Sequence, residues 1–350
     1  MRVLIDIGHP GHVHLFKHFA RIFLQKGHGV LFTVREKEHE TELLKSEKLP
    51  FTKMGRHYTS GPGKLWGLIY YNIKILFISF RFNPDVYLSH GSVYTLLSAL
   101  LSGKPNIALE DSGNKEQVRI YLPFTKAVLT STSFPYRYGR KQVLYNGYHE
   151  LAYLHPDYFT PDPGIYKELG LADGEAFSII RFVAWNASHD RKNAGLTTRQ
   201  KYEVVQQLAL HGRVYISSES ILPPDLEKLR FPLKPERLHH AIAFALLTVG
   251  EGATIASESA VLGTAAIYVN TIPRGYLEEQ ERDYGLVSCF RGFEGVLAKM
   301  QDLMDRPGLK AETKMKSERL IKDKCDLTGL MIRFIEGWPE SFGRTVDTGS

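Results

Sequence analysis

The chain has 350 residues, of which 43% are hydrophobic and 23% charged, an ordinary balance for a globular protein. This length exceeds what one hydrophobic core usually organises and predicts two domains. The net charge of +6 comes with neither zinc-finger spacing nor a helix of consecutive basic residues, which argues against a nucleic-acid-binding protein. Two cysteines without a CxxC pair, and an N-terminus without signal-peptide character, predict a cytoplasmic location.

Apolar runs of strand length alternate with helical patterns along the chain, which predicts an α/β protein with parallel sheets. The expected strands are Val3–Ile7, Val30–Val34, Val86–Ser89, Asn106–Leu109, Ala127–Thr130, Phe177–Phe182, Arg213–Ile216, Leu246–Val249 and Ala265–Val269. The expected helices are Val13–Gln25, 64–82, Tyr94–Leu101, Arg199–Leu210, Glu236–Phe244, Thr254–Leu262, Phe293–Met304 and Lys310–Trp338, the last with a break near Asp326.

The segment His155–Gly164 carries three prolines and a glycine, as an interdomain linker does. We therefore predict a first domain over 1–160, a second over 161–325 and a C-terminal helix and tail over 326–350. Each of the two domains is expected to be Rossmann-like, with the parallel sheets facing a central cleft.

The segment 64–82, KLWGLIYYNIKILFISFRF, combines aromatic and apolar residues with Lys64, Lys74 and Arg81. Its apolar stretch falls short of the roughly 20 residues that span a bilayer. Two interpretations stay open: a helix that touches the inner face of the membrane peripherally, and a helix packed beneath the sheet.

The loop Gly8–His14 follows the first strand and opens a helix, at the edge where parallel sheets bind ligands. An imidazole with a pKa near the working pH suits a general base, and His12 is the candidate. The alternative is that His12 caps the helix or orders the loop. A metal site is not predicted, because the histidine spacing crosses a turn and no cysteine or carboxylate cluster completes it.

Two further loops follow expected strands and carry ionisable side chains. His90 follows Val86–Ser89, and Glu110 follows Asn106–Leu109. Both are candidate catalytic groups for acid–base chemistry. Both could instead cap the helices that come after them.

In the second half, Leu246–Val249 leads into a glycine turn, a short helix and another strand. Backbone N–H groups of Gly252, Ala253 and Thr254 would face an anion at the helix N-terminus. Glu258, about one turn further on, could accept hydrogen bonds from both hydroxyls of a ribose. Arg181, at the end of an earlier strand, could pair with a diphosphate, and its alternative role is a surface ion pair.

The residue types and spacing in this strand–turn–helix–strand unit resemble a known motif. Gly252-Ala253, three residues, Ser257-Glu258 and then Gly263 resemble the donor motif of two-domain GT-B glycosyltransferases, especially the family that adds N-acetylglucosamine to the lipid-linked peptidoglycan precursor. Non-hydrolysing UDP-N-acetylglucosamine 2-epimerases share that fold. The whole chain also resembles the family called domain of unknown function 354.

The resemblance implies that Glu258 binds the uridine ribose and that the glycine turn, with Ser257 nearby, meets the diphosphate. It also implies that Glu279 and Gln280 read donor-sugar hydroxyls, and that the C-terminal helix crosses back to the first domain. In the 2-epimerases an Asp follows the His-Gly of the second loop, whereas this chain has Ser92 there. Their early Gly-Thr-Arg-Pro-Glu motif is absent as well, which places epimerisation in doubt.

These features predict a metal-independent glycosyltransferase that uses a nucleotide sugar, UDP-linked by the resemblance, in cell-surface polysaccharide or glycoconjugate biosynthesis. The expected partners are the nucleotide sugar and a sugar or lipid-linked acceptor, with no separate cofactor. Two alternatives remain: a 2-epimerase-like enzyme and a non-catalytic nucleotide-sugar-binding module. All three need Glu258, and only the two enzymes need an ionisable residue such as His12 or Glu110.

Overall fold

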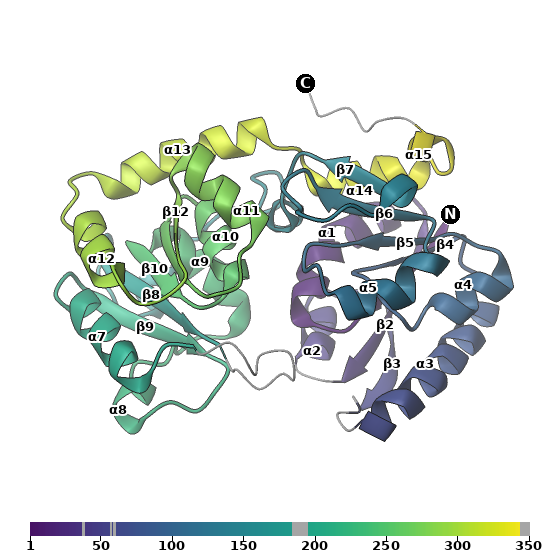
Figure 1. Cartoon of the computed structure of the whole chain (residues 1–350), viewed down its shortest axis with the longest axis horizontal. Helices are drawn as coiled ribbons and strands as arrows, with labels where there is room; N and C mark the ends of the chain where they lie inside the picture. Colours follow the sequence, from purple (N-terminus) through teal and green to yellow (C-terminus); the bar gives the residue numbers. More distant parts are fainter. Residues whose placement is uncertain (37–38, 57, 59–60, 184–194, 344–350) are drawn as a thin grey trace. The chain divides into compact units, whose positions relative to one another are not determined.

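A computed structural model describes residues 1–36, 39–56, 58, 61–183 and 195–343. The chain forms two compact units, shown in Figure 1. The first comprises Met1–Tyr153 and the segment from Lys324 onward, and the second comprises Leu154–Asp323. No helix in the described ranges is both long enough and apolar enough to cross a bilayer.

The first unit is built on a parallel seven-stranded sheet of order β3-β2-β1-β4-β5-β6-β7. Its strands are β1 (Arg2–Ile7), β2 (Gly29–Glu36), β3 (Phe51–Arg56), β4 (Val86–Ser89), β5 (Asn106–Leu109), β6 (Ala127–Ser131) and β7 (Gln142–Tyr145). Strand β1 pairs with β2 on one side and with β4 on the other, so the direction in which the chain adds strands to the sheet changes between β1 and β4.

Helices cover both faces of this sheet. Those of the first unit are α1 (Pro10–Gln25), α2 (Glu40–Ser46), α3 (Gly61–Phe82), α4 (Leu96–Ser102), α5 (Lys115–Tyr121), α14 (Leu327–Glu336) and α15 (Glu340–Gly343), with short 3₁₀ turns η1 (Leu122–Phe124), η2 (Gly139–Lys141) and η3 (His149–Ala152). Helices α3 and α4 pack on Leu4 and Tyr87 of the sheet. Helix α1 packs against α2, α14 and η3.

The second unit holds a parallel five-stranded sheet of order β12-β11-β10-β8-β9. Its strands are β8 (Phe177–Phe182), β9 (Arg213–Ser218), β10 (Leu247–Gly250), β11 (Ala265–Val269) and β12 (Val287–Phe290). Its helices are α6 (Ile165–Glu168), α7 (Thr198–Ala209), α8 (Pro224–Glu227), η4 (Pro235–Arg237), α9 (Leu238–Phe244), α10 (Ala253–Val261), α11 (Gly275–Glu279), the π-helical η5 (Gln280–Tyr284), α12 (Val296–Met304) and α13 (Leu309–Asp323).

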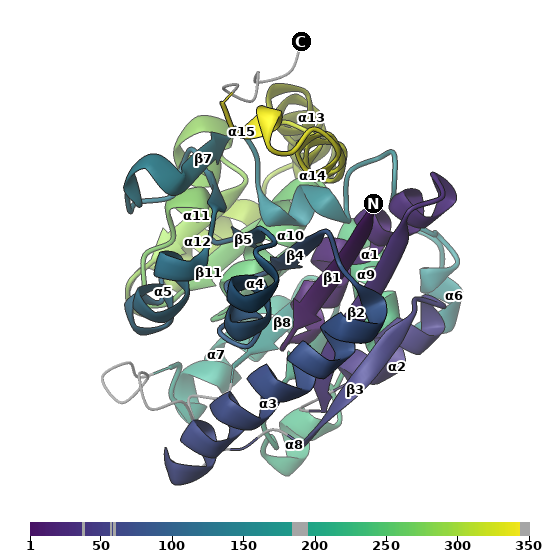
Figure 2. The ribbon, with the colours of Figure 1, turned by 90° about the vertical axis from the view of Figure 1, so that its right-hand side faces the viewer.

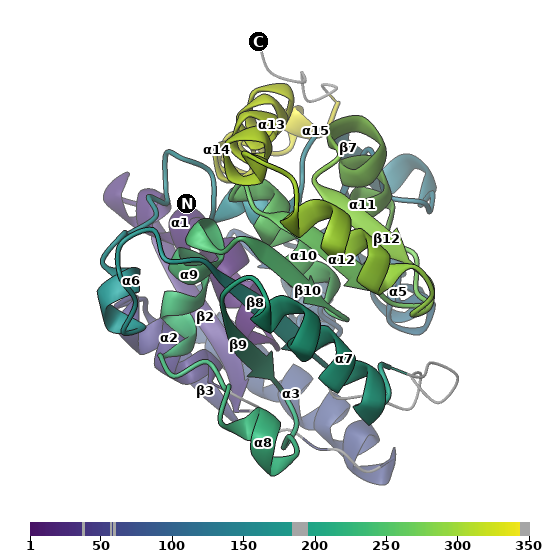
Figure 3. The same ribbon diagram turned by 90° about the vertical axis from the view of Figure 1, so that its left-hand side faces the viewer.

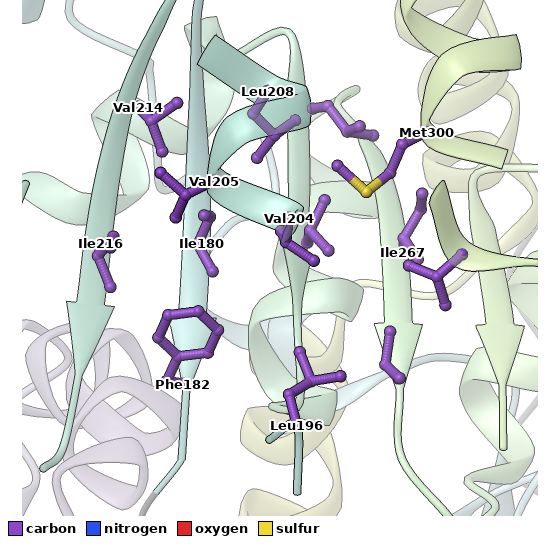
Figure 4. Packing of buried hydrophobic residues seen from close by; sticks show 14 of the residues in the cluster. Ile180, Phe182, Leu196, Val204, Val205, Leu208, Val214, Ile216, Ile267 and Met300 are labelled. Carbon is purple, nitrogen blue, oxygen red and sulfur yellow. The ribbon is translucent and has the colours of Figure 1, made fainter. Parts of the chain in front are cut away.

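Two hydrophobic cores lie on opposite faces of this second sheet. On one face, shown in Figure 3, α7 and α12 lie over the strands. Figure 4 shows their contacts, with Val204 and Leu208 of α7 and Met300 of α12 packed on Ile180 and Ile267. On the other face Ile179 packs with residues of α9 and α10. The strands are therefore buried on both faces, which explains their continuous apolar sequences.

The α/β class and the two Rossmann-like parallel sheets predicted from the sequence are confirmed. Three strands were not predicted, namely β3, β7 and β12, and each lies at the edge of a sheet. Edge strands are short and half solvated, so they lack a continuous apolar run. In β3, FTKMGR, Met54 is the buried residue.

The predicted linker is attached to the second unit. Asp162 pairs with Arg237 at 2.8 Å, its backbone N–H donates to Nδ1 of His240 at 3.0 Å, and Phe159 packs on the same imidazole. The break predicted near Asp326 is confirmed, because this residue is the N-cap of α14 and its carboxylate accepts from the N–H of Gly329.

Candidate functional site

Each sheet has one point where the chain reverses its direction of travel across the strands, and open α/β sheets bind ligands at the carboxyl ends of the strands there. In the first unit this point lies between β1 and β4. His90 follows β4 in a loop, whereas His12, predicted in a loop over Gly8–His14, lies in α1, which already begins at Pro10. In the second unit it lies between β8 and β10, which end near Arg181 and Gly250. Four of the predicted features thus lie at these switch points, namely His12, His90, Arg181 and the glycine turn, whereas Glu110, Glu279 and Gln280 follow other elements.

His12 lies in the first turn of α1, and its ring stacks on His90 with centroids 4.6 Å apart. The helix cap is His9, whose Nδ1 accepts from the N–H of Gly11 at 3.1 Å. The N–H of Gly8 approaches Nδ1 of His12 at 3.4 Å, which is long for a hydrogen bond and does not fix the tautomer. The capping role considered for His12 therefore belongs to His9.

The carboxylate of Asp111 contacts two histidines, His90 of the stacked pair and His149. Nε2 of His90 lies 2.9 Å from Oδ1 of Asp111, and Nδ1 of His149 lies 3.2 Å from Oδ2. Asp111 comes from the loop after β5 and His149 from η3, so three separate segments meet here. Asp111 and His149 were not predicted as site residues.

The charges of this cluster are strongly coupled. Burial alone would lower the pKa of His90, but the charge of Asp111 and its hydrogen bond raise that pKa to about 9. Burial works against the charge of Asp111, yet His149 and His90 hold its pKa well below the usual range. Burial and the adjacent charge of His90 lower the pKa of His12 well below its ordinary value. At neutral pH the neutral imidazole of His12 therefore stacks on the charged imidazole of His90.

The side chains of His90, Asp111 and His149 also have the spacing of a metal site, since their ligand atoms lie within 4.8 Å of one another. Two direct histidine–aspartate hydrogen bonds account for that spacing. The absence of a resident metal stays a prediction.

The hydrogen bonds of Glu110 go to residues outside the histidine cluster. Its Oε1 accepts hydrogen bonds from the N–H and the hydroxyl of Ser112 and from the N–H of Gly113, and its Oε2 accepts from the hydroxyl of Tyr121. These donors hold the loop after β5 in place, while the cap of α5 is Asn114. The catalytic role of Glu110 stays a prediction.

A second carboxylate under the same loops was not predicted. Asp6, at the end of β1, forms a buried ion pair with Arg35, whose Nη1 is 3.0 Å from both oxygens. The hydroxyl of Ser92 donates to Oδ2 of Asp6 at 2.5 Å. Ser92 therefore stands over a buried carboxylate, in the loop where 2-epimerases carry an aspartate of their own.

In the second unit, the end of β10, where the glycine turn begins, fits closely against β8. A Cβ at position 250 would lie 2.9 Å from the backbone nitrogen of Arg181 and closer still to its carbonyl oxygen. The N-cap of α10 is Gly252, so Ala253 and Thr254 open the helix as predicted. Gly263 has a positive φ of 75° just after the helix, the conformation expected of a terminating glycine.

The guanidinium of Arg181 is oriented by the neighbouring strand. Its Nη1 donates to Oγ of Ser217 at 2.7 Å, and its Nη2 lies 2.5 Å from Oε1 of Glu219. The ion pair considered as an alternative is therefore present. It holds the cation at the carboxyl end of the sheet, and the binding of a diphosphate by Arg181 stays a prediction.

Glu251, within the glycine turn, was also missed by the sequence analysis. One oxygen accepts from the N–H of Val183 at 3.0 Å and the other from the N–H of Leu196 at 2.5 Å, while Asn270 donates to its backbone carbonyl. These bonds join the ends of β8, β10 and β11. Residues 184–194, which follow Val183 in the chain, lie outside the described ranges.

Glu258 is buried on α10 and its Oε1 lies 2.9 Å from Nε2 of His239 on α9. His239 was not predicted to contact Glu258, and the role of Glu258 in ribose binding stays a prediction. Ser257 meets Gln280 in the same way, through a 2.8 Å bond from the amide Nε2 to the hydroxyl. Glu279, the neighbour of Gln280, is partly exposed at the end of α11.

No family model matches this sequence, and no curated protein matches it either. Solved structures do resemble it over its whole length. The Staphylococcus aureus MnaA–UDP complex has a TM-score of 0.70 at 10% identity and covers 100% of both chains. A Listeria monocytogenes protein assigned as a UDP-N-acetylglucosamine 2-epimerase has a TM-score of 0.69 at 12% identity, covering 100% of this chain and 98% of its own.

Glycosyltransferases resemble the chain as well. The SsfS6 glycosyltransferase of Streptomyces sp. SF2575 has a TM-score of 0.59 at 14% identity, covering 95% of this chain and 99% of its own. The chain therefore has the GT-B-like two-domain fold that glycosyltransferases and UDP-N-acetylglucosamine 2-epimerases share. At these identities the likeness concerns the fold, and membership in domain of unknown function 354 stays a prediction.

Proposed function

We propose that this protein is a glycosyltransferase that moves a sugar from a UDP-linked donor to an acceptor hydroxyl. The observation that carries the proposal is the neutral His12 stacked on the charged His90 at the switch point of the first sheet. A base must be unprotonated at the working pH, and the lowered pKa of His12 keeps its imidazole neutral there. The same shift makes His12 a weaker base than the imidazole with a pKa near the working pH that the sequence suggested.

The donor belongs to the second unit in this proposal. The N-terminus of α10 and the guanidinium of Arg181 receive the diphosphate, and Glu258 receives the ribose hydroxyls. As the bond to the sugar breaks, negative charge grows on the leaving diphosphate, and these donors stabilise it without a metal ion. His12 removes the proton of the acceptor hydroxyl that attacks the anomeric carbon. The acceptor is a sugar or a lipid-linked saccharide of cell-surface glycoconjugate synthesis.

A 2-epimerase is the second candidate, because the epimerase structures superpose with TM-scores of 0.69 and 0.70, against 0.59 for the transferase. Against it, Ser92 occupies the place of an epimerase aspartate, and Glu110 is engaged by four donors of its own unit. A nucleotide-sugar-binding module without catalysis is the third candidate.

The decisive experiment is incubation with UDP-N-acetylglucosamine in deuterated water. We expect no deuterium at C2 of the sugar, because that exchange requires proton abstraction from the ring. With a suitable acceptor the protein should release UDP, and EDTA should not change the rate. Deuterium at C2 in the NMR spectrum would contradict the transferase and favour the epimerase.

The donor base is tested separately by thermal unfolding with UDP-, GDP-, CMP- and dTDP-sugars. A ligand present at 100 times its dissociation constant stabilises a protein by about 2.7 kcal/mol. We expect the UDP-sugars to raise the melting temperature most. A larger shift with another base would change the donor assignment and leave the transferase mechanism intact.

A further inference from the structure

Helix α3 presents a row of large apolar side chains to solvent. Trp66, Ile69, Ile73, Phe77 and Phe80 follow one another at intervals of three and four residues, so they lie along one side of the helix. We call these five residues the outer α3 face. Phe77 is 66% exposed and Phe80 is 73% exposed, values far from those of a core helix.

The opposite side of α3 supplies the packing with the sheet. Tyr71 and Ile75 are buried there, together with Ser79, whose hydroxyl donates to the carbonyl of Ile75. Figure 2 shows α3 and α4 of the first unit facing the viewer. One side of α3 thus packs into the core of this unit, and the outer α3 face takes no part in that packing.

The neighbouring helix also exposes large apolar side chains. Helices α3 and α4 pack against each other, and α4 exposes Leu100 and Leu101. Monomeric proteins rarely expose contiguous apolar patches of this kind unless the patch binds something.

The charges on α3 distinguish between possible occupants. The helix contains Lys64, Lys74 and Arg81 and no acidic residue. Arg81 is exposed near Phe77 and Phe80, and the guanidinium of Arg2 lies 4.6 Å from the ring of Phe82 at the same end of the helix. Lys74 is tied inward, because its Nζ donates to the carbonyl of Met54 at 2.9 Å.

An acid-free helix suits an anionic surface better than a second copy of itself. A two-fold contact would place α3 against α3 and bring the same cations together without a carboxylate from either helix. A bilayer with anionic headgroups offers apolar chains to the outer α3 face and negative charge to the flanking cations.

We propose that this face docks on the surface of an anionic membrane, with α3 lying in the plane of the interface. The aromatic and aliphatic side chains of the outer α3 face enter the boundary between headgroups and acyl chains, and Arg81 stays at the headgroup level. The proposal depends on the surface of the first unit and not on the chemistry of the donor. It places the protein where a lipid-linked acceptor would be reached by diffusion in two dimensions.

The test is co-sedimentation of the full chain with vesicles. We expect binding to vesicles of phosphatidylcholine with phosphatidylglycerol, weaker binding to phosphatidylcholine alone, and loss of binding as salt rises, because the Debye length falls to about 3 Å at 1 M. The double variant Phe77→Ser/Phe80→Ser should bind the anionic vesicles roughly 10-fold or more weakly, since each side chain removes a large apolar area.

The matched control is Leu210→Ser/Ile221→Ser, which removes two apolar side chains of the second unit that are 74% and 93% exposed. This variant should bind vesicles like the wild type. Circular dichroism and UDP binding check that both variants are folded, so a failed donor site is distinguished from a failed membrane surface.

Three outcomes would overturn the proposal. The first is no vesicle binding by the wild type, and the second is equal binding by the α3 variant. The third is a wild-type dimer in analytical ultracentrifugation that the α3 variant loses while no vesicle is bound, because the face would then join two copies of the chain.

Discussion

The two switch points are built from the same kind of sheet but hold their polar groups differently. In the first unit, ionisable side chains contact one another, as in the series His12, His90, Asp111 and His149. In the second, Glu251 accepts from backbone N–H groups and the glycine turn brings a helix N-terminus close to β8. Coupled imidazoles suit proton transfer, and fixed backbone donors suit the binding of an anion.

Substitution of His12 should have the largest effect on turnover. His12→Ala removes the proposed base, and loss of a general base costs about 100-fold or more. Steady-state kinetics should show this loss, with UDP affinity measured by calorimetry unchanged. Wild-type turnover in the variant would show that His12 takes no part in the reaction. The first unit would then lose the proton-transfer role that distinguishes it from the second.

The glycine turn should be the most sensitive position of the second unit. Gly250→Ala would place a Cβ against the backbone of Arg181 and should lower the free energy of unfolding by about 2 to 3 kcal/mol. Gly292→Ala is the matched control, because a Cβ there meets nothing within 4 Å. Urea denaturation measures both variants, and equal stabilities would contradict the tight strand contact.

The charge on His90 should make the free energy of unfolding depend on pH. The pKa of His90 is raised to about 9 in the folded protein, above its unfolded value of about 6.5, so the bound proton stabilises the fold. This contribution, about 3 kcal/mol, is complete below pH 6.5 and is lost as the pH rises through 9.

The contribution can be isolated with Asp111→Asn, which removes the carboxylate that raises this pKa. Stability measured between pH 6.5 and 9 should fall less steeply in Asp111→Asn than in the wild type. Asp173→Asn, an exposed aspartate of the second unit, is the control and should retain the wild-type slope. Parallel curves for all three proteins would show that the histidine cluster is not charged as described.

The smallest effect is expected at the ribose position. Glu258→Gln keeps an acceptor for His239 and removes the charge, and a hydrogen bond to a charged group is worth about 1.5 to 3 kcal/mol. We expect UDP to bind about 10-fold more weakly. Glu278→Gln, an exposed neighbour of the site, should bind UDP normally. Calorimetry that finds equal affinities would make Glu258 an internal partner of His239 alone.

The sequence predicted where the loops of both sites lie, because apolar strands and terminating glycines such as Gly263 are local patterns. It did not predict which side chains meet. His149 lies on a short 3₁₀ turn far along the chain from Asp111, and only the packing of η3 brings them together. Asp6 was not predicted for a related reason. It forms a buried ion pair with Arg35, and such a pair leaves no mark in the hydrophobic periodicity of the sequence.

Glu251 joins the two boundaries of the stretch 184–194, since its carboxylate bonds to the N–H groups of Val183 and Leu196. One side chain therefore holds the described residues on either side of that stretch in fixed positions. The two bonds need both oxygens of one carboxylate. A neutral amide in its place has a single oxygen and could accept from only one of the two N–H groups, so one substitution would release one end of the stretch.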